Sequence, residues 1–265
     1  MNRRRFGVLL AGTAGAIASC RSTEEVVSST PSVVLRVSAA ASLKGVMERV
    51  QVAYEQENAA VAIVYNFGSS GALAQQIVQG GRVDAFISAA PGWIDSLSRA
   101  GLLLESSRQD LLKNSLVLVV PGDDDTLTST VFAFESLKDD RFERIAIGEP
   151  ESAPVGDYAK ESLQAMGLYD DLRSKLVLGK DSSQVLTYVA AGEVEAGIVY
   201  ATDAAKTDGV RLVAKIGADT HSPIVYPVAV IKESEHLGES RAFVDFLLSE
   251  VAAEIFLADG FELAK

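Results

Sequence analysis

Residues 33–54 read VVLRVSAAASLKGVMERVQVAY, a β-rich run followed by a stretch with helical periodicity. The first five residues are mostly β-branched, which predicts a strand at 33–37. Small residues follow up to Ser42, and the next stretch predicts a helix because its apolar side chains recur at helical spacing. A strand that passes through a short turn into an amphipathic helix is the repeating unit of α/β proteins.

The same unit recurs along most of the chain. Further strands are predicted at 61–65, 83–88, 115–121, 145–148, 176–178, 196–200, 210–216 and 226–231. Helices are predicted between them, for example at 93–100 and 157–166, and a long final helix is predicted at 239–258. Two consecutive series of strand, polar turn and helix fit two lobes better than one sheet, so we predict a two-lobed α/β fold.

The first twenty residues predict export. Arg3, Arg4 and Arg5 precede an apolar run at 7–18 that ends in small residues, as in a signal peptide. The run is too short to remain in a bilayer as a transmembrane helix. The arginines before Phe6 also resemble a twin-arginine export signal, and a plain basic region explains them equally well.

Cys20 is the one cysteine of the chain and lies where the signal would be cleaved. Residues 17–20, IASC, resemble the lipobox of bacterial lipoproteins, in which the cysteine is acylated. We therefore predict a signal peptide at 1–19, a lipid on Cys20 and a polar tether at 20–32. The protein would then be anchored to a membrane of the cell envelope and face the periplasm or the exterior. The alternative is an ordinary signal peptide with a cysteine at its cleavage site.

The composition narrows the classes of ligand. The formal net charge is −12, and removing residues 1–19 takes away three arginines and leaves −15. So acidic a surface argues against a nucleic-acid partner, which needs a basic stripe. It also repels anions at long range, so an anion site in this chain must depend on short-range hydrogen bonds.

Four short loops of small residues precede predicted helices, at 39–42, 68–71, 153–156 and 181–183. In open α/β sheets, ligands bind beyond the carboxyl ends of the strands, where loops enter helices. A helix N-terminus carries partial positive charge and free N–H groups, and several of them can hold an anion without lysine or arginine. The loops therefore predict an anion site, to which Tyr200 at the end of its strand would add a phenol.

Each of these features also has a simpler interpretation. A serine before a helix is most often only an N-cap, and Gly68 and Gly71 fit a tight turn. Tyr200 fits a half-buried aromatic residue whose hydroxyl lies in water. We predict a site because several such loops follow corresponding strand ends in order.

The loops and their neighbours resemble a known family, the periplasmic molybdate-binding proteins of ABC importers (type II solute-binding proteins). The resemblance extends over residues 33–262. It is carried by the following segments: 39–43 (AAASL), 67–73 (FGSSGAL), 84–89 (DAFISA), 114–117 (NSLV), 148–150 (GEP), 154–161 (PVGDYAKE), 197–200 (GIVY) and 226–230 (YPVAV).

The resemblance implies a periplasmic-binding-protein fold, in which each lobe is a mixed sheet flanked by helices and the ligand lies in the cleft. Lobe 1 would comprise 33–117 and 228–265, and lobe 2 would comprise 118–227. The implied ligand is molybdate or tungstate, with no cofactor and no metal beyond the oxyanion. The implied partner is an ABC permease, which would recognise a closed, monomeric, ligand-bound form.

The family's binding residues correspond to five positions. Hydroxyls would donate from Ser42, Ser70 and Tyr200, and backbone N–H groups from Val155 and Ser182. Val155 replaces a smaller residue and Ser182 replaces a valine, which leaves the size and polarity of the pocket open at both positions.

Other classes remain as alternatives. A secreted serine hydrolase is disfavoured, because residues 68–72 lack the second glycine of a Gly-x-Ser-x-Gly elbow and neither His221 nor His236 lies in a catalytic motif. Calcium at Asp123 to Asp125 competes with a solvated turn, which we favour. Sulfate, thiosulfate and phosphate are rival ligands, and a purely structural envelope lipoprotein is a third class.

Overall fold

The computed structural model describes residues 31–123 and 133–264. Residues 31–265 form one compact unit. The predicted signal peptide at 1–19, Cys20 and most of the predicted tether lie outside the described residues, as do Asp124 and Asp125. Of the helices that are described, none is both long and apolar enough to cross a membrane.

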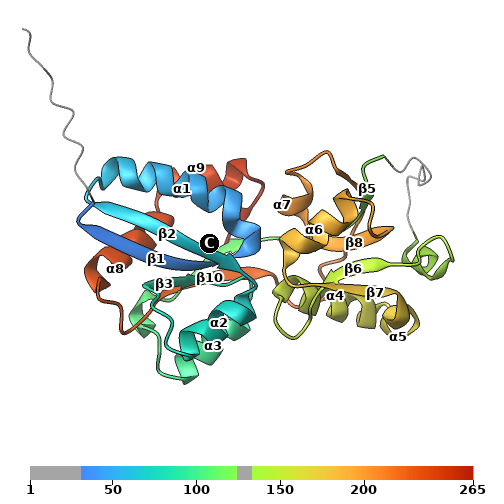
Figure 1. The fold of residues 1–265 in the computed structure, drawn as a ribbon, viewed down its shortest axis with the longest axis horizontal. Coiled ribbons are helices and arrows are strands. Elements are labelled where there is room, and N and C mark those ends of the chain that lie inside the picture. The colour runs from blue at the N-terminus through green and yellow to red at the C-terminus, as the bar shows by residue number, and fades with distance from the viewer. Residues whose placement is uncertain (1–30, 124–132, 265) are drawn as a thin grey trace, which may run out of the picture. The chain divides into compact units, whose positions relative to one another are not determined.

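One sheet of six strands forms the core of what we call lobe 1 (Figure 1). Its order is β11-β4-β10-β3-β1-β2. The strands are β1 (Val33–Ala40), β2 (Val61–Gly68), β3 (Ala85–Ile87), β4 (Gln109–Lys113), β10 (Val225–Val230) and β11 (Glu262–Leu263). β1 is parallel to β2 and β3, whereas β10 is antiparallel to β3 and β4, so the sheet is mixed.

A second, five-stranded sheet forms the core of lobe 2, in the order β7-β6-β8-β5-β9. The strands are β5 (Leu116–Pro121), β6 (Ile145–Gly148), β7 (Leu176–Gly179), β8 (Ala196–Tyr200) and β9 (Val210–Lys215). β6 is parallel to β7 and β8, and β5 is antiparallel to β8 and β9. The chain passes between the lobes after β4, at Asn114, and returns between β9 and β10, over residues 216–224.

Helices cover both faces of each sheet (Figure 1). Lobe 1 carries α1 (Lys44–Glu57), α2 (Ser70–Val78), α3 (Pro91–Arg99), α8 (Leu237–Leu247) and α9 (Glu250–Ala258). Lobe 2 carries α4 (Pro154–Ala165), α5 (Tyr169–Leu172), α6 (Ser182–Ala190) and α7 (Ala201–Ala204). Short 3-10 turns are η1 (Ala41–Leu43), η2 (Glu105–Ser107), η3 (Phe134–Lys138) and η4 (Arg173–Lys175). The predicted two-lobed α/β fold with mixed sheets is confirmed.

The strand-turn-helix unit at 33–54 folds as its apolar spacing predicts. Val46, Met47, Val50 and Tyr54 are the buried side of α1. Tyr54 meets the rings of Phe243 and Phe246 edge-on, each at 5.2 Å between centroids. Burying an apolar side chain of this size stabilises the fold by about 1.5–3 kcal/mol, so this face holds α1 against the sheet and against α8.

Two predictions about helices were wrong in their bounds. The helix predicted at 239–258 is two helices, because Ser249 is extended and its hydroxyl accepts from the Ala252 N–H, which starts α9 afresh. The helix predicted from residue 157 begins at Pro154, since proline is well suited to the first helical position. Strands β4 and β11 were not predicted.

Candidate functional site

The structure brings all five predicted residues to one small cavity between the lobes. Its lining comprises Ala40, Ala41, Ser42, Gly68, Ser69, Ser70 and Ala89 from lobe 1, and Ala153, Pro154, Val155, Asp181, Ser182 and Tyr200 from lobe 2. Its free volume is about 10 Å³, on the scale of one water molecule. The described lining residues include no lysine or arginine. A small cavity lined by neutral hydrogen-bond donors suits a compact anion.

Helix N-termini surround the cavity, as the four loops predicted. α2 begins at Ser70, α4 at Pro154 and α6 at Ser182, and η1 leads into α1 directly after Ala40. The first N–H groups of a helix have no partner within the helix and carry its partial positive charge. Several such termini at one point make the cavity favourable for negative charge.

The simple N-cap interpretation applies to other residues than those predicted to bind. The side chain of Ser69 caps α2 by accepting from the Ala72 N–H, and Asp181 caps α6 by accepting from the Gln184 N–H at 2.9 Å. Ser70 and Ser182 are therefore the first residues within their helices. Their own N–H groups are not needed by the cap.

The Ser70 hydroxyl makes one hydrogen bond within the fold and can make another to a ligand. Ser70 is fully buried, and its Oγ accepts from the Ala89 N–H at 2.9 Å. A hydroxyl that accepts a hydrogen bond still has one hydrogen to donate. The structure therefore leaves a neutral donor on a side chain that lines the cavity.

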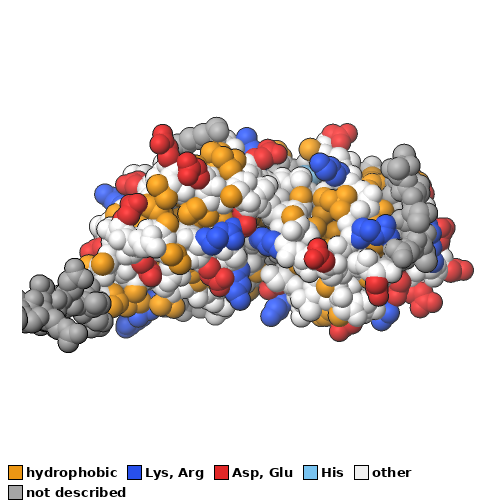
Figure 2. Space-filling model, turned by 90° about the horizontal axis from the view of Figure 1, so that it is seen from above, with side chains coloured by type: hydrophobic (Ala, Val, Ile, Leu, Met, Phe, Trp, Pro, Cys, Tyr) orange, Lys and Arg blue, Asp and Glu red, His pale blue; other side chains and the backbone are white. Residues whose placement is uncertain are grey.

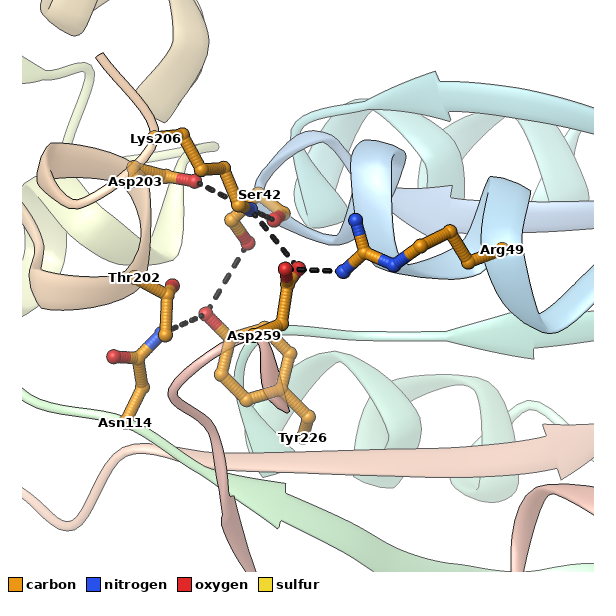
Figure 3. Close-up of polar contacts among 8 residues, drawn as sticks. All are labelled: Ser42, Arg49, Asn114, Thr202, Asp203, Lys206, Tyr226 and Asp259. Atoms are coloured by element: carbon orange, nitrogen blue, oxygen red, sulfur yellow. Dashed lines mark hydrogen bonds and ion pairs between the residues drawn. The ribbon is translucent and has the colours of Figure 1, made fainter. Parts of the chain in front are cut away.

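The Ser42 hydroxyl also has a hydrogen-bond partner within the fold, the hydroxyl of Tyr226 (Figure 3). Ser42 is 2 % exposed, and its Oγ lies 3.2 Å from Tyr226 Oη. Tyr226 in turn lies 3.2 Å from Asn114 Nδ2, and the same nitrogen donates to Thr202 Oγ1 at 2.9 Å. Burial raises the pKa of Tyr226, so its hydroxyl keeps its proton.

Tyr200 is buried, which contradicts the interpretation of a half-buried ring with its hydroxyl in water. It is 1 % exposed, and its hydroxyl lacks a hydrogen-bond partner among the described residues, although Tyr226 lies close by. Burial, and then the neighbouring Tyr226, Tyr158 and Asp203, raise the pKa of Tyr200, so the phenol stays protonated. A buried hydroxyl without a partner costs free energy, and a ligand that accepts its hydrogen would remove this cost.

Val155 and Ser182 offer backbone rather than side-chain donors. Val155 follows Pro154, so it bears the first N–H of α4, and its side chain packs over Gly148. A Cβ on Gly148 would come within 2.7 Å of that side chain, so Val155 fits because residue 148 is glycine. The Ser182 hydroxyl faces the Asp203 carboxyl, whose negative charge it helps to hold.

Three charged residues near the site were not predicted from the sequence. Asp181 lines the cavity, and Asp203 lies beside Ser182. Burial raises the pKa of Asp203 to about 6, against the lowering effect of Lys206 and Ser182. Lys206 Nζ, from lobe 2, donates to the Ser42 carbonyl oxygen at 3.2 Å and lies 3.8 Å from Asp259 (Figure 3). Asp259 also pairs with Arg49.

The lobes also touch at the other loops of the site. The Gly71 N–H donates to the Ser152 carbonyl oxygen at 2.9 Å. The Tyr158 hydroxyl donates to the Ala89 carbonyl oxygen at 3.4 Å. Lobe 1 and lobe 2 are thus joined directly around the cavity, by bonds that must break if the lobes separate.

Neither histidine joins this cavity. His221 contacts Ser222 and the ring of Tyr158, and His236 lies just before α8. Within residues 31–123 and 133–264, no group of three or more His, Cys, Asp and Glu side chains is placed to hold a metal ion. The face in Figure 2 carries acidic and basic side chains side by side, rather than one broad basic surface.

Comparisons with known proteins place the chain in a family. Residues 35–262 match the family model for bacterial extracellular solute-binding proteins. The putative ABC transporter substrate-binding lipoprotein YvgL of Bacillus subtilis (strain 168) is 42 % identical over 245 residues, with 92 % of both chains covered. The molybdate-binding protein ModA of Escherichia coli (strain K12) is 39 % identical over 233 residues, with 86 % of this chain and 89 % of the relative covered.

Solved structures agree. The substrate-binding domain of a putative molybdenum ABC transporter from Clostridium difficile is 40 % identical, with a TM-score of 0.68 and coverage of 88 % of this chain and 100 % of that one. The periplasmic molybdate-binding protein of Azotobacter vinelandii shares the fold at 23 % identity, with a TM-score of 0.78 and coverage of 87 % and 100 %. The predicted resemblance is confirmed, and the chain belongs to the bacterial extracellular solute-binding proteins of ABC transporters.

Proposed function

We propose that this protein captures molybdate, and tungstate with it, in the cavity between its lobes and presents the anion to an ABC permease. The observation that carries the proposal is the convergence of donors from both lobes on one small cavity. Ser42 and Ser70 contribute from lobe 1, and Val155, Ser182 and Tyr200 from lobe 2. The relatives named for molybdate binding support the choice of anion.

The proposed mechanism couples binding to closure. Only the closed arrangement completes the set of donors, so the anion stabilises that arrangement. The lobes would move about Asn114 and residues 216–224, where the chain passes between the two sheets, and the closed form is what the permease would recognise. Because the free volume is about 10 Å³, the lobes must part by a small amount to accommodate a tetrahedral anion.

The donors also define the charge state of the anion. Hydroxyl and N–H donors favour an oxyanion that is fully deprotonated, whereas a protonated phosphate needs an acceptor for its own hydrogen. Asp181 is the one carboxylate in the described lining, and one of its oxygens is engaged by the Gln184 N–H. Sulfate has the same charge and shape as molybdate but is smaller, so the size of the closed cavity must discriminate between them.

The test is calorimetry of ligand-stripped protein with molybdate, tungstate, sulfate and phosphate. We expect tight binding of the first two and little heat from the others. Tight binding of sulfate without molybdate or tungstate would assign the site to another oxyanion. Binding of none of the four anions would refute the proposal and favour a purely structural role.

A paired variant tests the predicted residues. Replacing Ser42→Ala and Ser70→Ala together should weaken molybdate binding at least about tenfold, since each hydroxyl would lose a charge-assisted hydrogen bond. The matched control is Ser96→Ala with Ser106→Ala, which alters two exposed serines outside the cavity lining. Equal affinity of both pairs would show that the cavity serines do not bind the anion.

We also propose that the protein is exported, is acylated on Cys20 and acts as a monomer. The lipoprotein among its relatives and the extracellular family support export. Labelled palmitate should be incorporated into the wild type and not into Cys20→Ala, which should be released from the membrane. Light scattering of a version that begins at residue 31 tests the monomer.

A further inference from the structure

Asn114 makes a set of hydrogen bonds whose direction is determined by one backbone group. Its Oδ1 accepts from the Ser115 N–H at 2.9 Å. A backbone N–H can only donate, so the side-chain oxygen must face Ser115 and the NH2 group must face the other way. That NH2 group donates to Thr202 Oγ1 at 2.9 Å and to Tyr226 Oη at 3.2 Å.

The hydrogen bond from Asn114 also determines where the Tyr226 hydroxyl donates. Its oxygen accepts from Asn114, and a phenol has a single hydrogen, which is then left for the neighbour on the other side. That neighbour is Ser42 Oγ, at 3.2 Å (Figure 3). Tyr226 is fully buried, so water does not offer an alternative partner. The Tyr200 hydroxyl also approaches Tyr226, but no hydrogen bond of normal geometry joins the two, so Ser42 is left to accept from Tyr226.

Ser42 is the end of the series. Because its oxygen accepts from Tyr226, its own hydrogen is free, and the side chain lines the cavity. We propose that Asn114 is a positioning residue: through Tyr226 it makes the Ser42 hydroxyl an obligate donor towards the bound anion. The inference rests on the proposed function and extends it. Asn114 acts without touching the ligand.

The hydrogen bond from Asn114 to Thr202 also connects this residue to lobe 2, which would move on closure. Asn114 lies where the chain passes from β4 to β5, and Thr202 belongs to α7 of lobe 2. The orientation of Ser42 in lobe 1 is thus set by a residue at the crossover that is also bonded to lobe 2. A series of hydrogen bonds polarises its members cooperatively, which strengthens the final donor.

The substitution Asn114→Asp reverses the direction of these hydrogen bonds, although the two side chains have almost the same shape. The new oxygen that replaces Nδ2 can only accept, so the hydroxyls of Thr202 and Tyr226 must turn towards it. Tyr226 then accepts from Ser42, and Ser42 presents a lone pair to the anion. Tyr226→Phe instead removes the link, and the Ser42 hydroxyl can then rotate to donate freely.

The test measures molybdate affinity by calorimetry in five variants and the wild type. We expect Asn114→Asp to weaken binding at least about 100-fold and Tyr226→Phe to weaken it less than about tenfold. The double variant should bind within about tenfold of Tyr226→Phe, because cutting the series restores the Ser42 donor. The control for added charge is Asn66→Asp, an exposed asparagine of β2, which should change affinity less than about threefold. Thr202→Val, which keeps the Tyr226 link, should also bind within about tenfold of the wild type.

The pattern separates the inference from simple charge repulsion. If the added charge of Asn114→Asp acts alone, the double variant stays as weak as Asn114→Asp, and the proposal is overturned. Thermal unfolding of each ligand-free variant shows which of them are folded. Neutron diffraction of the ligand-free wild type gives a second measurement, which does not depend on any anion. We expect the deuterium between Tyr226 and Ser42 to be bonded to Tyr226, and a deuterium bonded to Ser42 there would refute the inference even if molybdate binds.

Discussion

Gly71→Ala should hold the lobes apart. Gly71 lies in the first turn of α2, and its N–H bonds to the Ser152 carbonyl oxygen of lobe 2 at 2.9 Å. A Cβ at this position would lie 2.6 Å from that oxygen and 2.6 Å from Trp93 Cζ2. The tryptophan ring can turn away, but the carbonyl belongs to the backbone. The glycine is therefore required for close approach of the lobes, rather than for the tight turn that its sequence context suggests.

The size of the effect follows from these distances. A comfortable carbon–oxygen contact is about 3.3 Å, so the two backbones must separate by about 0.7 Å at this point (3.3 minus 2.6). The Gly71–Ser152 hydrogen bond then stretches from 2.9 Å towards about 3.6 Å and is lost. Losing that bond costs about 0.5–1.5 kcal/mol, and displacing donors from the anion adds about as much again. We expect the closed complex to lose about 1–3 kcal/mol, which weakens binding about 5- to 150-fold.

Calorimetry with molybdate measures the affinity, and the fluorescence of Trp93 reports closure, since it is the one tryptophan of the chain and lies against this contact. The control is Gly45→Ala in α1, where nothing beyond the adjacent residues and the backbone of α1 lies within 4 Å of the position of the new Cβ. Ligand-free Gly71→Ala should unfold at nearly the wild-type temperature, because the partly buried Trp93 ring can turn away and the Ser152 contact joins the lobes. A folded variant that binds molybdate within twofold of the wild type would refute the steric argument.

Three further predictions concern the charged residues and the phenol. Lys206→Met should weaken molybdate binding about 3- to 30-fold at low salt, because it removes the contacts to the Ser42 carbonyl and Asp259. The loss of affinity should be smaller at high salt, where ions screen the charge. A loss that does not depend on salt would contradict this explanation. The folded-state pKa of Asp203 is about 6, above its usual 3.8, so the folded state binds the proton more tightly. This group should add up to about 3 kcal/mol to the free energy of unfolding as pH falls from above 6 to about 3.8. Asp203→Asn should remove that part of a denaturant-measured pH profile. Tyr200→Phe should stabilise the ligand-free protein in thermal unfolding and weaken binding about tenfold, because its buried hydroxyl is unpartnered without the anion.

Local signals account for most of the fold that could be predicted from the sequence. The apolar spacing of α1 and the β-rich run before it depend on neighbours within a few residues, and both formed as predicted. The break at Ser249 was missed because apolar residues continue on both sides of it. β11 is two residues long and pairs with β4, so no periodicity could reveal it.

The positions of Ser42, Ser70, Val155, Ser182 and Tyr200 at one cavity followed from the order of loops and from family resemblance. Which of their groups donate and which accept could not be predicted in this way. Whether Ser70 accepts from Ala89, or which of Ser69 and Ser70 caps α2, depends on the packed backbone. A sequence states which groups can donate or accept, and only their partners decide which they do.

By itself, the amino-acid sequence determined the alternation of strands and helices, the small-residue loops at helix N-termini and the acidic charge, because each depends on residue type and short spacing. The tertiary structure decided the rest of the site. Ser42 and Tyr226 are 184 residues apart, Lys206 and Ser42 are 164 apart, and Asn114 and Tyr226 are 112 apart. No local pattern encodes such contacts, since they exist only after two sheets have packed their own cores and brought their loops together.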